Sequence, residues 1–314
     1  MPLDPRVKRF LNVLNAGNPP SILTASAAQR RAGHLELMKF SGPTPPLDGL
    51  EERRIPTPAG DLSARLYTPK DAAPGLLPGL VYFHGGGLMS GSGASHDAVA
   101  AALANAGGCR VLSVDYRLAP EHRFPAAVED ALAAMIHVQA HAADYGIDPK
   151  RLGIGGDSAG ATLAAVTVHG LARSGRPPPV LQLLLCPLLD HLSTSASRRE
   201  LRRGYLVDED TFAHDLLHYL PDGVDAADPR ISPLRVPDLA GVPRTLVHTA
   251  EFDPLRDEGR EYADRLAATG TPVSYTCHPG MIHLFYGMGS VIPYAGTAYQ
   301  IIGRELRGAF RPDA

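Results

Sequence analysis

Gly156-Asp157-Ser158-Ala159-Gly160 has the pattern Gly-x-Ser-x-Gly, and it joins a short apolar run to a stretch of helical composition. A serine in this pattern lies on a sharp strand-to-helix turn, where only glycine fits on either side because a Cβ would clash. The turn lifts the serine hydroxyl away from the sheet and exposes it for nucleophilic attack. Ser158 is therefore the candidate nucleophile.

The pentapeptide alone is weak evidence, because a chain with 32 glycines contains such patterns by chance. A glycine-rich turn is the simpler alternative. A dinucleotide-binding loop is disfavoured, since that fingerprint opens its domain and is followed by an acidic residue about 20 positions later. Here the motif lies in mid-chain, and the corresponding stretch, Arg176-Pro177-Pro178-Pro179, contains no acid.

His84-Gly85-Gly86-Gly87 follows the apolar run Leu80-Val81-Tyr82-Phe83 directly. Glycines at the carboxyl end of a parallel strand present backbone N–H groups where ligands bind in such sheets. An oxyanion needs two or three such donors, and each contributes about 3 kcal/mol to transition-state stabilisation. Gly85, Gly86, Gly87 and Ala159 form the candidate oxyanion hole, with the last three as donors. A flexible loop is the alternative, whereas no Gly-Lys-Ser/Thr follows that would make a Walker loop.

A serine nucleophile needs a histidine base and an acid that orients it. In one large fold class these groups follow in the order Ser, acid, His, each just after a strand. Asp253 follows the expected strand Thr245–Thr249, and His283 follows the expected strand Val273–Cys277. We expect Ser158, Asp253 and His283 to form a catalytic triad.

Several neighbours compete for these roles. Glu251, Asp257 and Glu258 are alternative acids, but Asp257 and Glu258 suit the first turn of a helix. His278 and His84 are alternative bases. His278 falls within or at the end of the last strand, and His84 is expected to brace the glycine loop.

Strands and helices alternate along most of the chain, which predicts an α/β fold with a mostly parallel central sheet flanked by helices. Glu51–Pro58 and Leu62–Tyr67 alternate apolar and polar residues around a turn, which predicts an antiparallel edge hairpin. The other expected strands are Leu80–Phe83, Arg110–Tyr116, Leu152–Gly155, Val180–Cys186, Thr245–Thr249 and Val273–Cys277. The expected helices are Asp4–Leu14, Thr24–Phe40, His96–Ala106, Ala126–Ala143, Ala159–Arg173, Glu258–Ala268 and Ala295–Arg307.

Two segments depart from this alternation. Residues 1–49 read as an appended helical segment, and about 191–228 read as an insertion of helical and irregular sequence. The remainder of 50–314 is expected to form one catalytic domain, a length that a single large α/β domain allows.

Jointly, the motifs resemble the hormone-sensitive-lipase-type (bacterial family IV) carboxylesterases of the α/β-hydrolase superfamily. The matching stretches are His84–Gly87, Asp115–His122, the turn at Ser158, Asp253–Gly259 and His283. The resemblance implies an α/β-hydrolase fold, a helical cap built from both departing segments, and an acyl-serine mechanism without a cofactor. Asp115–His122 is then a structural turn near the glycine loop.

The chain departs from the family's pattern at Leu88, where an aromatic residue is common, and at Leu284, where glycine is common. Both positions bear on the shape of the substrate pocket. The short cap segments suggest a closed pocket, and hence a preference for short- to medium-chain acyl esters. The expected pocket residues are Leu88, Asp157, Leu206, Phe212, Leu216 and Leu284.

Composition limits the partners. The formal net charge is −3 without a basic block, which disfavours nucleic acid. Residues 1–20 lack the pattern of a signal peptide, and the longest apolar run, Val180–Leu189, is too short to span a bilayer. We therefore expect no stable membrane association. Three cysteines, far apart and odd in number, suggest free thiols and a cytoplasmic location. The oligomeric state stays open, with a homodimer as one option.

His214 and His218 are one helical turn apart, a spacing that zinc ligands use. The metalloprotease pattern requires Glu after the first histidine, and this chain has Asp215. We expect a helix face of the cap and no metal.

Two other functions are compatible with parts of this pattern. A receptor of the same fold that binds its ligand without turnover would typically lack the catalytic histidine, whereas His283 is present. An amidase or peptidase of the same fold could use the same triad. The main expectation is an ester hydrolase acting on a small-molecule substrate.

Overall fold

The computed structural model describes residues 2–17 and 21–311. Residues 1 and 18–20 of the expected segment 1–49, and residues 312–314 of the expected domain 50–314, lie outside the described residues. The described chain contains an eight-stranded sheet in the order β1-β2-β4-β3-β5-β6-β7-β8. Its strands are β1 (Gly49–Ile55), β2 (Leu62–Thr68), β3 (Leu77–Phe83), β4 (Arg110–Asp115), β5 (Ile147–Asp157), β6 (Leu181–Leu185), β7 (Arg244–Phe252) and β8 (Val273–Ile282).

The sheet has the expected mixed character. β1 pairs with β2, and β2 with β4, in antiparallel fashion, whereas every pair from β4-β3 to β7-β8 is parallel. Parallel strands with both faces covered are apolar along their whole length. β6 follows this rule except at Gln182, because its other four residues are buried leucines. The predicted α/β-hydrolase architecture and the predicted edge hairpin are confirmed.

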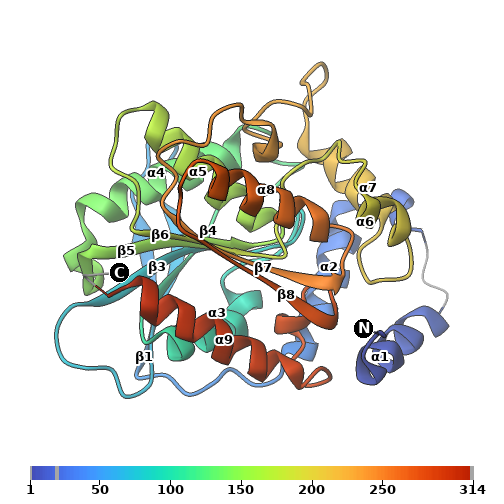
Figure 1. Ribbon diagram of the computed structural model, residues 1–314, viewed down its shortest axis with the longest axis horizontal. Helices are drawn as coiled ribbons and strands as arrows, with labels where there is room; N and C mark the ends of the chain where they lie inside the picture. Colours follow the sequence, from blue (N-terminus) through green and yellow to red (C-terminus); the bar gives the residue numbers. More distant parts are fainter. Residues whose placement is uncertain (1, 18–20, 312–314) are drawn as a thin grey trace.

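Helices cover both faces of the sheet (Figure 1). On one face lie α3 (Asp97–Gly107) and α9 (Tyr294–Ala309), and on the other lie α4 (Ala126–Ala140), α5 (Ala159–Arg173) and α8 (Arg256–Ala268). α5 follows β5 directly and is buried along almost its entire length, in keeping with its run of Ala, Val, Leu and Thr. It begins and ends where the sequence predicted.

The remaining helices gather at one end of the molecule, toward which β7 and β8 point (Figure 1). They are α1 (Pro5–Ala16), α2 (Ala27–Met38), α6 (Ala196–Glu200) and α7 (Glu209–Tyr219), and we refer to α2, α6 and α7 as the cap helices. α2 begins with a complete capping box, in which Ser26 and Gln29 each bond the other's backbone N–H. The helix therefore starts at Ala27, three residues later than the predicted start at Thr24.

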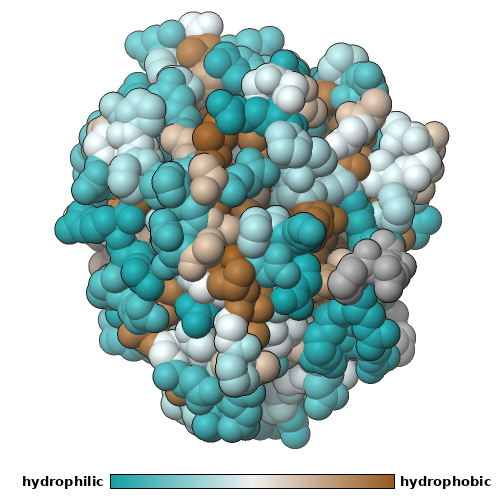
Figure 2. Space-filling model, turned by 90° about the vertical axis from the view of Figure 1, so that its left-hand side faces the viewer, coloured by the Kyte–Doolittle hydropathy of each residue, from teal (hydrophilic) through white to brown (hydrophobic). Residues whose placement is uncertain are grey.

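The surface opposite the cap is mostly hydrophilic, with hydrophobic residues only in small groups (Figure 2). Small scattered apolar groups are normal for a protein surface and need no partner. Among the described residues, no helix combines the length and the apolar character needed to cross a membrane.

The packing of α9 against α3 yields a prediction about stability. A Cβ built on Gly303 of α9 would lie 2.3 Å from the Ala106 carbonyl oxygen. Gly303→Ala should therefore lower the free energy of unfolding by about 1–3 kcal/mol, the usual cost of overpacking. Gly296, on the same helix, is exposed and has no atom within 4 Å of its would-be Cβ. Gly296→Ala should raise the free energy of unfolding by about 0.5 kcal/mol. Urea unfolding measures both, and equal effects would contradict the close packing.

Candidate active site

Ser158 lies on the turn between β5 and α5 with φ 53° and ψ −121°, a conformation that is costly for a residue other than glycine. A Cβ on Gly156 would lie 2.4 Å from the Gly160 carbonyl carbon. A Cβ on Gly160 would lie 2.0 Å from the Phe83 carbonyl oxygen at the end of β3. The two glycines therefore allow α5 to pass close to β3, and the pattern is more than a chance glycine-rich turn.

Three side chains from three strand ends meet beside this turn. His283 follows β8, and its Nε2 lies 3.0 Å from Ser158 Oγ. Its Nδ1 lies 2.8 Å from Oδ2 of Asp253, which follows β7. Asp253 is fully buried, and its Oδ1 accepts the Leu255 N–H at 2.9 Å. The structure thus brings Ser158, His283 and Asp253 into one hydrogen-bonded chain.

The competing acids have other partners. Glu251 accepts the Gly280 N–H at 2.7 Å, and Asp257 accepts the Ser197 N–H at 2.7 Å. Glu258 is buried and forms an ion pair with an arginine of α6 at 2.6 Å. Burial raises the pKa of Glu258, although that arginine offsets part of the effect. These carboxylates hold the cap and strand ends in place.

The competing histidines also have other surroundings. His278 lies inside β8, with its Nε2 3.1 Å from His248 Nδ1, and burial lowers its pKa to about 3. His84 stacks on the Tyr116 ring at 4.5 Å, and burial lowers its pKa to about 4. Both imidazoles are therefore neutral near pH 7, and His84 braces the glycine loop as expected.

The glycine loop, residues 84–87, lies beside Ser158. The Gly85 N–H donates to Asp157 Oδ1 at 3.0 Å, and the same oxygen accepts the Tyr82 hydroxyl at 2.6 Å. Burial raises the pKa of Asp157, which these hydrogen bonds oppose. The N–H groups of Gly86, Gly87 and Ala159 have no acceptor within the described residues. Gly85 thus differs from the other members of the expected oxyanion hole, because its amide is already used.

A cavity of about 140 Å³ opens over Ser158 and His283, and we call it the catalytic cavity. It lies between the glycine loop, α2 and α7. Its lining consists of Ile22, Arg30, His34, Leu37, Gly86, Gly87, Asp157, Ser158, Leu188, His191, Leu206, Val207, Thr211, Phe212, Asp215, His283 and Leu284.

Four of the six expected pocket residues line the catalytic cavity, and two do not. Leu88 has a left-handed backbone with φ 61° and turns into the hydrophobic core. Leu216 lies along a neighbouring cavity of about 620 Å³ on another side of α7. The expectation that these two leucines form the pocket is therefore corrected.

Arg30 and Asp215 are charged residues that line the catalytic cavity and that the sequence did not indicate as site residues. Arg30 Nε and Nη2 donate to the two carboxylate oxygens of Asp215 at 3.0 and 2.8 Å. In the sequence, Asp215 stands out only as the second residue of the His214–His218 motif. The capping box at Ser26 was the one local signal that could have placed Arg30 in the first turn of a helix.

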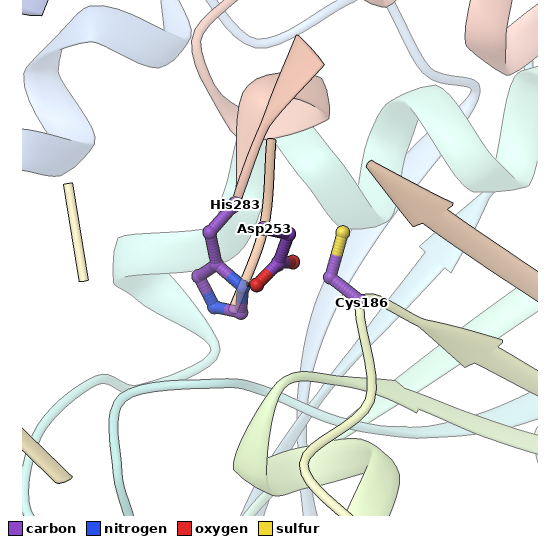
Figure 3. A group of neighbouring side chains, drawn as sticks. All are labelled: Cys186, Asp253 and His283. Carbon is purple, nitrogen blue, oxygen red and sulfur yellow. Dashed lines mark hydrogen bonds and ion pairs between the residues drawn. The ribbon is translucent and has the colours of Figure 1, made fainter. Parts of the chain in front are cut away.

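Cys186 is a neighbour that the sequence did not indicate. Figure 3 shows Asp253 between His283 and Cys186. The thiol, the carboxylate and the imidazole offer ligand atoms within 4.8 Å of one another, which is close enough for a metal ion. A metal would require a thiolate, but burial raises the pKa of Cys186 well above its usual range. Both nitrogens of His283 are also engaged with Asp253 and Ser158. These features disfavour a metal at this group.

His214 and His218 lie on α7 with their ring centroids 4.4 Å apart. His214 Nε2 is 3.0 Å from the Ala25 carbonyl oxygen, and His218 Nδ1 is 2.9 Å from the His214 carbonyl oxygen. The first contact joins α7 to the segment before α2, and the second lies within α7, so both histidines have partners in the packing around α7.

Comparison with known proteins supports this assignment of the fold. A family model described as α/β hydrolase fold matches residues 80–287. The chain is 38% identical to the carboxylic ester hydrolase LipN of Mycobacterium tuberculosis, over 91% of this chain and 77% of that protein. It is 35% identical to an arylesterase of Saccharolobus solfataricus, over 91% of this chain and 93% of that protein.

Solved structures agree. An α/β-hydrolase enzyme from the metagenome of Lake Arreo superposes with a TM-score of 0.95 at 36% identity, covering 98% of both chains. A hyperthermophilic esterase from Pyrobaculum calidifontis gives 0.91 at 36% identity, covering 99% of this chain and 100% of that one. The chain therefore belongs to the α/β-hydrolase fold family, in the hormone-sensitive-lipase-type group that its motifs resemble.

Proposed function

We propose that the protein is a carboxylesterase that hydrolyses small-molecule esters through Ser158, His283 and Asp253. The observation that carries this proposal is His283, whose two ring nitrogens reach the serine hydroxyl and the buried carboxylate at 3.0 and 2.8 Å. This is the arrangement that a serine nucleophile needs. Relatives named as a carboxylic ester hydrolase, an arylesterase and a carboxylesterase give independent support.

In the proposed reaction, Ser158 Oγ attacks the ester carbonyl carbon while His283 Nε2 takes the hydroxyl proton. Asp253 accepts the Nδ1–H of His283, which holds the ring in the required tautomer and stabilises the imidazolium. The carbonyl oxygen becomes an oxyanion, for which Gly86, Gly87 and Ala159 supply free N–H donors.

The tetrahedral intermediate then collapses. The bond to the alcohol oxygen breaks, and His283 returns its proton to that oxygen as the alcohol leaves. The acyl group stays on Ser158 until a water, deprotonated by His283, attacks the carbonyl carbon. A second collapse releases the acid and restores the serine hydroxyl. Every proton in the cycle passes through His283, so the proposed mechanism needs no cofactor.

We propose that the segments 1–49 and 191–228 act as a cap over this site, which sets the size of the substrate. The cavity volume of about 140 Å³ is small beside the ~300–1,000 Å³ of typical ligand pockets. Its walls include the apolar side chains of Leu206, Phe212 and Leu284. These features favour short- to medium-chain acyl groups.

Other parts of the proposal rest on the sequence. Cys109, Cys186 and Cys277 are free thiols, in line with a reducing compartment. The cytoplasmic location, the lack of stable membrane association and the option of a homodimer stay predictions.

The first test replaces the nucleophile. Ser158→Ala should lower kcat for p-nitrophenyl butyrate by up to about a million-fold, because the triad members act as a unit. Ser174, an exposed serine at the end of α5, bonds only nearby helix carbonyls, so Ser174→Ala serves as the control. A Ser158→Ala protein that kept more than a few per cent of the turnover would refute the assignment.

The second test separates the proposed acid from its neighbour. Asp253→Asn should lower kcat roughly ten-thousand-fold by favouring the wrong imidazole tautomer. Its amide oxygen can still accept the Leu255 N–H, so the fold should persist. Asp257→Asn should cost far less, since Asp257 bonds Ser197 instead. Steady-state kinetics with circular dichroism measure both, and equal losses would mean that Asp253 is not the acid.

The third test concerns chain length. Each acyl methylene that enters the cavity contributes about 0.8 kcal/mol, or close to fourfold in kcat/KM, until the cavity is full. Across a series of p-nitrophenyl esters, kcat/KM should rise from acetate to about butyrate or hexanoate and then fall. A steady rise through dodecanoate would instead indicate an open, lipase-like site.

A further inference from the structure

Asp215 lies unusually close to the glycine loop. A Cβ built on Gly87 would lie only 1.8 Å from Asp215 Oδ2, so the carboxylate takes the space that any larger residue at position 87 would need. Gly87 is also one of the proposed oxyanion donors. The Asp215 side chain is 8% exposed, and it lines the catalytic cavity together with Gly87 and Ser158.

A carboxylate in this position opposes the proposed reaction. The transition state of ester hydrolysis carries negative charge on the former carbonyl oxygen. A second negative charge beside the same loop raises the energy of that oxyanion, and the effect is large where water is excluded. The acid therefore needs a partner that cancels its charge.

Arg30 supplies that charge. It comes from α2, 185 residues away in the chain, and binds both carboxylate oxygens of Asp215 with its own side chain 12% exposed. The other titratable groups around Asp215 are His214 on its own helix, with Nδ1 3.2 Å from Oδ1, and the cavity residues His34, Asp157, His191 and His283. Burial lowers the pKa of His34 to about 2 and that of His191 to about 4, so neither provides a cation near pH 7.

We propose that Arg30 is a positioning residue of the esterase site, which neutralises Asp215 over the glycine loop so that Gly86 and Gly87 can stabilise the oxyanion. The inference rests on the proposed function. Arg30 then affects kcat by cancelling the negative charge of Asp215, in addition to joining α2 to α7 through the ion pair.

The test compares four variants with the wild-type enzyme on p-nitrophenyl butyrate. Arg30→Gln leaves Asp215 unpaired and should lower kcat by roughly ten- to a hundredfold, with a much smaller change in KM. Arg30→Lys keeps the charge and should retain most of the activity. Asp215→Asn should cost clearly less than Arg30→Gln. The double variant Arg30→Gln/Asp215→Asn should recover most of the kcat that the single arginine variant loses.

Arg203→Gln is the matched control, because Arg203 pairs with Asp210 on α7 in an exposed position. If the Arg30–Asp215 ion pair only joined α2 to α7, a different result would be expected. Arg30→Gln, Asp215→Asn and the double variant would then lose the same activity, in parallel with their melting temperatures. That result, or an unaffected Arg30→Gln, would overturn the inference while leaving the esterase assignment in place.

A second readout covers the case in which Arg30→Gln folds poorly. The boron of butylboronic acid bonds to Ser158 Oγ while the hydroxyl proton passes to His283. The resulting tetrahedral boronate anion mimics the charge of the transition state. In Arg30→Lys, the inhibition constant should rise by no more than several-fold. In Asp215→Asn, the inhibition constant should not rise, because the cation remains and the carboxylate is gone. Weaker inhibition of Asp215→Asn than of Arg30→Lys would refute the proposal. A wild-type enzyme that hydrolyses no ester would refute the proposed function itself.

Discussion

The site depends on one close approach, between the start of α5 and the end of β3. The Phe83 carbonyl oxygen would be 2.0 Å from a Cβ on Gly160, so no side chain can separate the two elements. The glycine loop follows β3, and Ser158 follows β5, the strand next to it. Because these two elements touch, Ser158 and the free amides of Gly86 and Gly87 lie on the same edge of the sheet. The strained backbone of Ser158 lies directly beside this contact.

Much of this arrangement could be predicted from the sequence, because its signals are local. Runs of apolar residues mark buried strands, and α5 could be bounded from Ala159 to Arg173 by composition alone. The order of Ser158, Asp253 and His283 places each residue after a strand, and parallel strands deliver such residues to a common edge. Strand lengths were less predictable. β8 continues to Ile282 because its pairing with β7 resumes after an irregularity at Ala250 and Phe252.

The sequence indicated which two segments would form the proposed cap, but not how their helices pack. Its packing depends on contacts between residues far apart in the chain, such as Arg30 and Asp215, which leave no periodic pattern. The direction in which α7 faces illustrates this. Thr211 and Asp215, one turn apart, face the catalytic cavity, whereas Leu216 lies one position further around the helix, along the neighbouring cavity. Leu216 was predicted to line the pocket because it is apolar, but the rotation of α7 places it along the neighbouring cavity.

Three buried histidines near the glycine loop are uncharged near pH 7. His34 stacks on His96 with ring centroids 5.6 Å apart, and His96 lies tilted against His84 at 5.3 Å. Burial lowers the pKa of His34 to about 2 and the pKa values of His84 and His96 to about 4. These rings fill space without adding charge near pH 7. The charged and dipolar groups around the proposed oxyanion site are therefore the loop amides, the N-terminus of α5, Asp157 and the Arg30–Asp215 pair.

The order of the strands has a consequence for how the enzyme loses activity. Ser158 and the glycine loop follow β5 and β3, in the interior of the sheet, whereas His283 follows β8, which forms the edge and pairs only with β7 among the described strands. Edge elements open locally at lower free energy than the centre of a domain. Fraying of the last residues of β8 would move His283 away from Ser158 while the turn that carries Ser158 stays intact. If His283 is the base, as proposed, mild denaturation is expected to remove activity before it removes the fold.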